Sequence, residues 1–177
     1  MQVKPGSLLI AHPAHAPSHI KHHVVFITES THRSTVGLTL NRPNRHTLSD
    51  IMRSKGIDWQ LDDQLYTGGD YNTTAMIVLH SEEWYSTSTM PVTDRWGITS
   101  DTVMLEKFEQ FNTPMDYRIF VGCTGWEPEE LEDELKGRHP RWLLMPNPSS
   151  DLIMAEPEHQ WDLAIIECGH NTVKKFF

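Results

Sequence analysis

The chain has 177 residues, a length at which one domain with its own hydrophobic core is expected. Its net charge of -9, from 24 acidic and 15 basic residues, disfavours non-specific binding to nucleic acid, which depends on Lys and Arg neutralising phosphates. Its two cysteines lie far apart and form no CxxC pair, which fits neither a disulfide framework nor a structural zinc site and suits a reducing compartment.

The first 60 residues predict three strands and one helix. Short apolar or β-branched runs cover Ser7–Ala11, His23–Thr28 and Thr35–Leu40. The third run alternates between apolar and small or polar residues, as a strand with one buried face does. The polar stretch Glu29–Ser34 is expected to connect the second strand to the third as a hairpin. Thr47 is then expected to cap a short amphipathic helix.

The remaining residues mix strands with three more helices. Strand-like runs cover Gln64–Tyr66, Ala75–His80, Trp96–Thr99, Tyr117–Cys123 and Trp142–Met145. Helices are expected over Asp101–Phe111 after a Ser100 cap, from Pro128 to about Lys136 before Gly137, and from Pro157 to a terminating Gly169. Because strands and helices do not alternate in one long series, the pattern favours an α+β fold over a doubly wound sheet.

No segment is predicted to enter a membrane. The apolar patch near the start is too short for the hydrophobic region of a signal peptide, and no later stretch approaches the roughly 18 apolar residues of a membrane span. Together with the wide spacing of the two cysteines, this predicts a soluble cytoplasmic protein built as a single domain over residues 1–170. Residues 171–177 are expected to form a C-terminal tail.

A histidine run in the N-terminal third is the most conspicuous chemical feature. Imidazole is a ligand for zinc, copper, iron and nickel. Pro13 and Pro17 interrupt any helix that would align these side chains, so only His19, His22 and His23 are candidates for a shared metal site. A closed site needs three or four well-placed ligands, so a histidine-rich polar connection between two strands is the favoured interpretation.

Three other features of the sequence are candidates for reactive or binding groups. The stretch Glu127–Glu134 holds six carboxylates, but it opens a predicted helix, where acidic side chains on a solvated face are expected. Gly68 and Gly69 either bring backbone amides close to an anion or form a tight turn. Cys123 is a candidate nucleophile with His80 as its base, although apolar cysteines usually belong to the core. The sequence contains no GxSxG, GxGxxG, GxxxxGK[ST] or HExxH motif.

Several segments, taken in order, resemble the AlgH/YqgE family of small bacterial proteins. They are Leu9–Pro13, Val24–Ile27, Gly37–Pro43, Tyr66–Gly69, Val78–His80, Thr99–Asp101, Gly122–Glu132, Trp142–Leu143 and the closing pattern Trp161, Ala164 and Gly169. The resemblance implies a mixed, strongly bent β-sheet that forms a partial barrel, flanked here by about four short helices. Members of the family are labelled transcriptional regulators, and the resemblance carries over no DNA-binding motif, cofactor or catalytic residue.

This chain departs from the family pattern at places where a binding surface is expected. Asp70 stands where the family has proline, and Ala75 and Met76 stand where it has an Arg-Gly pair. His22 replaces a second arginine, and a carboxylate at position 130 replaces glutamine. Two arginines fewer and two carboxylates more make an anionic partner less suited to this chain than to the family in general.

These observations predict a non-enzymatic regulatory or protein-interaction protein with no cofactor, whose partner is another protein. The candidate surface comprises Asn41, Arg42, Pro43, Gly68, Gly69, His80, Gly125 and Trp126. Bracing of turns is an alternative role for Asn41, Arg42 and Trp126. Two other functions stay open: a nucleic-acid-binding transcriptional regulator that uses the first 60 residues, whose charge balance is +4, and a metal-dependent or thiol enzyme that uses the histidine run or Cys123.

Overall fold

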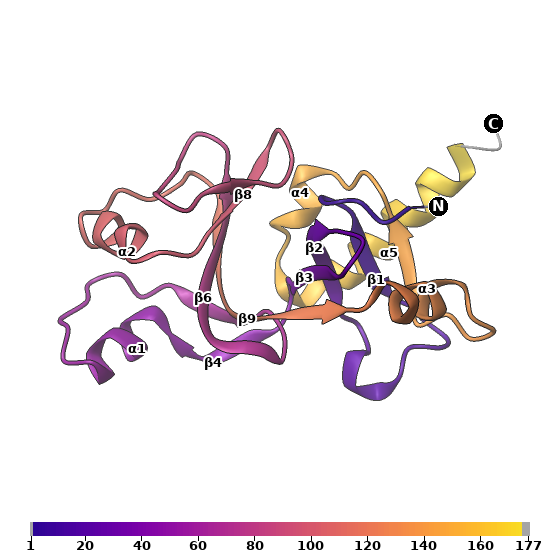
Figure 1. Cartoon of the computed structure of the whole chain (residues 1–177), viewed down its shortest axis with the longest axis horizontal. Coiled ribbons are helices and arrows are strands. Elements are labelled where there is room, and N and C mark those ends of the chain that lie inside the picture. The colour runs from indigo at the N-terminus through magenta and orange to yellow at the C-terminus, as the bar shows by residue number, and fades with distance from the viewer. Residues whose placement is uncertain (1, 175–177) are drawn as a thin grey trace.

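The computed structural model describes residues 2–174 and shows one bent sheet with helices around it (Figure 1). The strands are β1 (Leu8–Ala11), β2 (Val24–Ser30), β3 (Thr35–Thr39), β4 (Pro43–Thr47), β5 (Gln64–Thr67), β6 (Tyr71–Ser81), β7 (Met90–Pro91), β8 (Trp96–Thr99), β9 (Tyr117–Trp126) and β10 (Trp142–Met145). The helices are α1 (Leu48–Ser54), α2 (Thr102–Glu109), α3 (Pro128–Lys136), α4 (Ser150–Ile153), α5 (Pro157–Lys174) and the 3-10 helix η1 (Ser18–Ile20). The predicted α+β class is confirmed.

The sheet follows the order β10-β1-β2-β3-β9-β6-β8-β7, and β4 and β5 join it beside β9. Strands β5 and β9 are parallel, whereas the other described pairs are antiparallel. Figure 1 shows β9 running from the half that contains β6, β8, α1 and α2 to the half that contains β1, β2, β3 and α3. The mixed, strongly bent sheet implied by the family resemblance is therefore confirmed.

Strand β9 belongs to the cores of both halves. Successive residues of a strand point to opposite faces. Ile119 accordingly packs in a cluster with residues of α1 and α2, such as Met52 and Phe108. Its neighbour Phe120 packs in a second cluster with residues of β1, β2, α4 and α5. Burial of apolar surface on both faces holds the halves against the same strand.

Three glycines allow the chain to cross β9 between β5 and β6. A Cβ on Gly68 would lie 2.3 Å from the carbonyl oxygen of Gly122, and one on Gly69 would lie 2.1 Å from the carbonyl oxygen of Cys123. Gly122 itself has a φ of +76°, and a Cβ there would lie 2.5 Å from the oxygen of Gly69. No side chain larger than hydrogen fits at these contacts, so Gly68 and Gly69 form a backbone crossing and are buried.

All four predicted helices begin within one residue of their expected positions, and α2 and α3 end within two residues of the predicted ends. Thr47 and Asp50 form a capping box at the start of α1, and α3 covers the predicted range. The cap of α2 is Asp101 rather than Ser100, because the Asp101 carboxylate accepts a hydrogen bond from the amide of Met104. None of the helices in residues 2–174 is long and apolar enough to cross a membrane.

The last helix extends past its predicted end. Gly169 lies inside α5, which continues to Lys174, so the predicted stop at Gly169 is wrong. A glycine inside a helix costs only about 1 kcal/mol relative to alanine, which is too little to end a helix that packs on β1 and β2. Residues 171–174 of the predicted tail are therefore helical, and residues 175–177 lie outside the described residues.

Four short elements were missed by the sequence patterns: β4, β7, η1 and α4. Strand β4 is polar and pairs with β5 only at Pro43 and Thr47, around an irregularity, so it shows no alternation. Strand β7 has two residues, η1 has three and α4 has four. The two-, three- and four-residue segments span only about one period of the strand or helical pattern, which is too little to recognise, and their neighbours in the fold determine them.

We expect Gly69→Ala to destabilise the protein by about 2–3 kcal/mol, because a Cβ at that position meets backbone that cannot move aside. Gly169→Ala is the matched control, since a Cβ there meets nothing within 4 Å and alanine favours the helix by about 1 kcal/mol. Urea unfolding of both variants measures the difference. Equal effects of the two substitutions would contradict the crossing described above.

Candidate functional site

A cleft of about 490 Å³ lies over the end of β9 and is called the β9 cleft below. It is lined by residues 33–36, Tyr71, Asn72, residues 123–127 and Glu130. Four parts of the fold meet there: the β2–β3 hairpin, the start of β6, the end of β9 and the N-terminus of α3. The segment that the family resemblance had singled out, residues 122–132, therefore supplies one wall and the floor of this cleft.

The floor of the β9 cleft is hollowed at Gly125. Cys123 and Gly125 lie on the same face of β9, and Gly125 pairs with Val36 of β3. A Cβ added to Gly125 would meet only the carbonyl oxygen of Thr35, at 3.7 Å, which is an ordinary contact. Unlike the glycines of the crossing, Gly125 is not required by neighbouring atoms, so its missing side chain leaves open space in the cleft.

The rim of the β9 cleft combines an exposed aromatic ring with charged groups. The Tyr71 side chain is 62% exposed, and Asn72 follows it with a positive φ of 49°. Glu127 and Glu130 form the capping box of α3 at one end of the cleft. Arg33 of the β2–β3 hairpin is the one cation among the lining residues. The arrangement suits a ligand that presents donors or positive charge to the α3 end.

Cys123 is placed at the floor of the cleft but not as an activated nucleophile. Its side chain is 8% exposed, and burial raises the pKa of its thiol above the ordinary value, although a hydrogen bond with Asn72 opposes this. His80 pairs with Tyr117, six residues before Cys123 on β9. At the usual rise per residue, about 20 Å of strand separates the two side chains. The predicted Cys123–His80 pair does not form.

His80 is a buried structural residue. It is 1% exposed, and its Nδ1 lies 2.9 Å from the carbonyl oxygen of Ser81 while its Nε2 lies 2.8 Å from Thr99 Oγ1. Burial lowers the pKa of His80 below its ordinary value, so the neutral ring is favoured. Both ring nitrogens are engaged, and His80 therefore lies outside any exposed binding surface.

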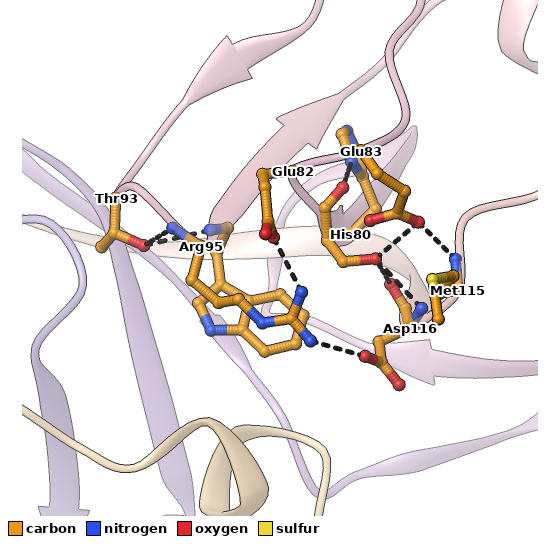
Figure 2. A network of polar contacts seen from close by, with 9 residues as sticks. His80, Glu82, Glu83, Thr93, Arg95, Met115 and Asp116 are labelled. Atoms are coloured by element: carbon orange, nitrogen blue, oxygen red, sulfur yellow. Dashed lines mark hydrogen bonds and ion pairs between the residues drawn. The ribbon is translucent and has the colours of Figure 1, made fainter.

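Polar contacts at the end of β6 hold the chain together near His80 (Figure 2). Glu83 accepts a hydrogen bond from Ser81 Oγ at 2.9 Å. Arg95 forms ion pairs with Glu82 at 2.7 Å and with Asp116 at 2.8 Å, and these three side chains are between 42% and 50% exposed. Exposed ion pairs contribute little individually. We interpret the network as a tie between the end of β6, the turn before β8 and the start of β9.

The other residues of the predicted surface either brace the backbone or line the β9 cleft. Asn41 accepts a hydrogen bond from the amide of Val24 at 3.0 Å and donates to the carbonyl of His22 at 2.8 Å, so it braces the start of β2. The carbonyl of Arg42 accepts from the amide of Thr67 at 2.8 Å.

Trp126 is 7% exposed, and its indole donates to Glu134 of α3 at 3.0 Å. Pro43 is exposed at the start of β4, on the far side of β5 from β9. Of the eight predicted surface residues, only Gly125 and Trp126 line the β9 cleft, while Gly68, Gly69, His80 and Trp126 are buried. The structure therefore does not bring these eight residues together in one exposed surface.

The three candidate metal ligands of the run, His19, His22 and His23, have different surroundings. His22 has a positive φ of 64° and its ring packs on Trp161 with centroids 4.5 Å apart. His19 is exposed on η1, and His23 is half-buried beside β2. Within residues 2–174, no group of three or more His, Cys, Asp or Glu side chains is placed to hold a metal ion. The predicted metal set His19, His22 and His23 is therefore not assembled in the structure.

Sequence reasoning missed Tyr71, Asn72 and Arg33 as cleft residues. Tyr71 and Asn72 begin β6 four residues before the predicted strand, and Arg33 lies in a hairpin that was interpreted only as a connection. The signal available in the sequence was a tyrosine that follows the Gly68–Gly69 pair by two residues. Its meaning depended on Tyr71 pairing with Cys123, a contact between residues 52 positions apart.

We expect the free energy of unfolding of the wild type to fall more steeply than that of a His23→Asn variant as the pH drops from about 6.5 to about 4. Burial, together with the positive charge of Arg42, lowers the pKa of His23 from 6.5 to about 4. Over this interval the unfolded chain binds a proton that the folded chain does not, so the folded state loses stability. Urea unfolding at each pH measures the free energy of unfolding of both proteins. If the difference between wild type and variant stays constant from about pH 6.5 to about pH 4, the expectation is contradicted.

Comparison with known proteins agrees with the described geometry. The profile of a family described as AlgH-like matches residues 8–173. The UPF0301 protein of Sphingopyxis alaskensis is 28% identical over 167 residues, which cover 93% of this chain and 88% of that protein. The UPF0301 protein of Alcanivorax borkumensis is 30% identical, with coverage of 92% and 87%.

Solved structures share the fold. The solution structure of the AlgH protein from Pseudomonas aeruginosa matches with a TM-score of 0.76 at 24% identity, over 93% of this chain and 90% of that chain. A crystal structure of a protein from Corynebacterium diphtheriae matches with a TM-score of 0.70 at 18% identity, over 91% and 85%. With the fold shared and the profile matched over nearly its whole length, this chain belongs to the AlgH-like family.

Proposed function

We propose that this chain is a non-enzymatic regulatory or protein-interaction protein of the cytoplasm that binds another protein in the β9 cleft. The observation that supports this most is the cleft itself, about 490 Å³ in volume, which joins an exposed tyrosine, strand backbone and the start of a helix. Exposed aromatic side chains beside accessible backbone are typical of surfaces that recognise other proteins.

The enzyme alternative has less support. Cys123 lines the cleft, but burial raises the pKa of its thiol, and His80 is engaged elsewhere in the fold. A nucleophilic thiol needs a lowered pKa and a base within hydrogen-bond reach. The nucleic-acid alternative is also weaker at this cleft, because Glu127 and Glu130 would repel phosphates and Arg33 is the one cation among the lining residues.

We expect Cys123 in the folded protein to react with a thiol reagent at pH 8 at least about tenfold more slowly than the same cysteine in urea. Its low exposure and raised pKa both reduce the concentration of accessible thiolate. The experiment uses a Cys168→Ser background, so that a single thiol is followed by absorbance. Folded-state labelling as fast as in urea would favour the thiol-enzyme alternative instead.

A photo-crosslinking amino acid in place of Tyr71 is expected to capture a protein in cells, whereas the same group in place of Tyr85 is not. Both tyrosines are exposed, at 62% and 71%, but only Tyr71 lines the β9 cleft. Adding Gly125→Val should abolish the capture, because the valine side chain fills the cleft floor while the backbone tolerates it. Capture at both positions, or capture that survives Gly125→Val, would refute the assigned surface.

A further inference from the structure

We propose that the occupant of the β9 cleft is an extended segment of a partner protein that carries a lysine or arginine. The segment pairs with the free edge of β9 and directs its cation toward Tyr71, Glu127 and Glu130. This inference rests on the proposed function and names the chemistry of the partner.

The end of β9 has an open edge. Strand β3 pairs with residues 124–126 on one side of β9, and the pairing with β6 on the other side ends where Tyr71 meets Cys123. Among the described residues, no other backbone hydrogen bond reaches residues 124–126. A free strand edge presents unpaired N–H and C=O groups, and an extended peptide satisfies them by adding a strand. The edge lies in the cleft, where Thr124 and Gly125 are partly exposed.

Among the described residues, the two carboxylates at the cleft form no ion pair, unlike Glu132 and Glu134 on the same helix. On α3, Glu132 forms an ion pair with Lys136 at 2.8 Å and Glu134 forms one with Arg141 at 2.9 Å. Glu127 and Glu130, which line the cleft, form no ion pair among the described residues. Two carboxylates of α3 outside the cleft are neutralised by ion pairs, whereas the two carboxylates at the cleft keep their negative charge. A positively charged ligand therefore complements this end of the cleft.

Tyr71 supplies the second element of recognition for a cation. Its ring is 62% exposed on the first residue of β6, directly opposite Cys123 at the floor. The face of an aromatic ring attracts a lysine or arginine side chain, and more so where water is partly excluded. Arg33, on the hairpin across the cleft, disfavours a second cation there. The cleft is therefore suited to one basic side chain on an otherwise neutral strand.

The test is selection of random octapeptides displayed on phage against the wild-type protein, after removal of phage that bind the Gly125→Val variant. The expected result is enrichment of peptides with one central Lys or Arg flanked by β-branched residues. Enrichment of acidic or purely apolar peptides would overturn the inference and leave the proposed function standing. No enrichment over Gly125→Val would overturn both.

Variants separate the contributions of charge and of backbone pairing in an enriched peptide. Glu127→Gln with Glu130→Gln keeps the capping oxygens and removes both charges, and we expect at least about tenfold weaker binding by fluorescence anisotropy. Glu129→Gln with Glu132→Gln is the control, because it makes the same change in net charge outside the cleft. N-methylation of every second backbone amide of the peptide can start at an odd or an even position. One of these two patterns should abolish binding, because it blocks the amides that point toward β9. Equal loss in both double variants, or no loss from methylation in either pattern, would contradict the proposed mode.

Discussion

The close backbone contact between the β5–β6 connection and β9 is the constraint on which the rest of this fold depends. Gly68, Gly69 and Gly122 bring two segments of the backbone so near that a Cβ on Gly69 would stand 2.1 Å from a carbonyl oxygen. The crossing carries the chain from one edge of β9 to the other, so β9 exchanges neighbours along its length. Beyond the crossing, β3 pairs with one edge and the other edge is left free. The β9 cleft is a geometric consequence of that exchange.

A buried arginine at the start of β9 holds segments near β3, α4 and α5 against this strand. Arg118 is 8% exposed and donates to the carbonyl oxygens of Leu40 and Ala155 at 2.8 and 3.0 Å, and to Gln160 at 3.3 Å. Its guanidinium lies 4.5 Å from the ring centroid of Tyr66. Burial lowers the pKa of Arg118, and the oxygens and the aromatic face offset part of the cost of burying the charge. The contacts join the end of β3, the residues after α4 and the first turns of α5 to the start of β9.

Local pattern predicted most of the regular elements because their cause is local. The capping box of Thr47 and Asp50, and the proline and glycine that bound α3, depend on residues within a few positions of one another. The roles of His80 and Gly69 could not be derived in the same way. His80 is engaged by Thr99, 19 residues away, and Gly69 is confined by Cys123, 54 residues away. A histidine or a glycine pair looks chemically available in a sequence until the tertiary fold shows which atoms surround it.

The same reasoning divides the segment from Gly122 to Glu130 into two kinds of residue. Gly122 and Trp126 have structural explanations, since Gly122 has a positive φ at the crossing and the Trp126 indole donates to Glu134. Gly125 has none of these: its φ is ordinary and a Cβ would fit. Glu127 and Glu130 cap α3, yet capping needs only an acceptor oxygen and leaves their charges unneutralised. The open floor at Gly125 and the carboxylates of Glu127 and Glu130 line the same cleft, and a ligand that fills space and brings positive charge accounts for them together.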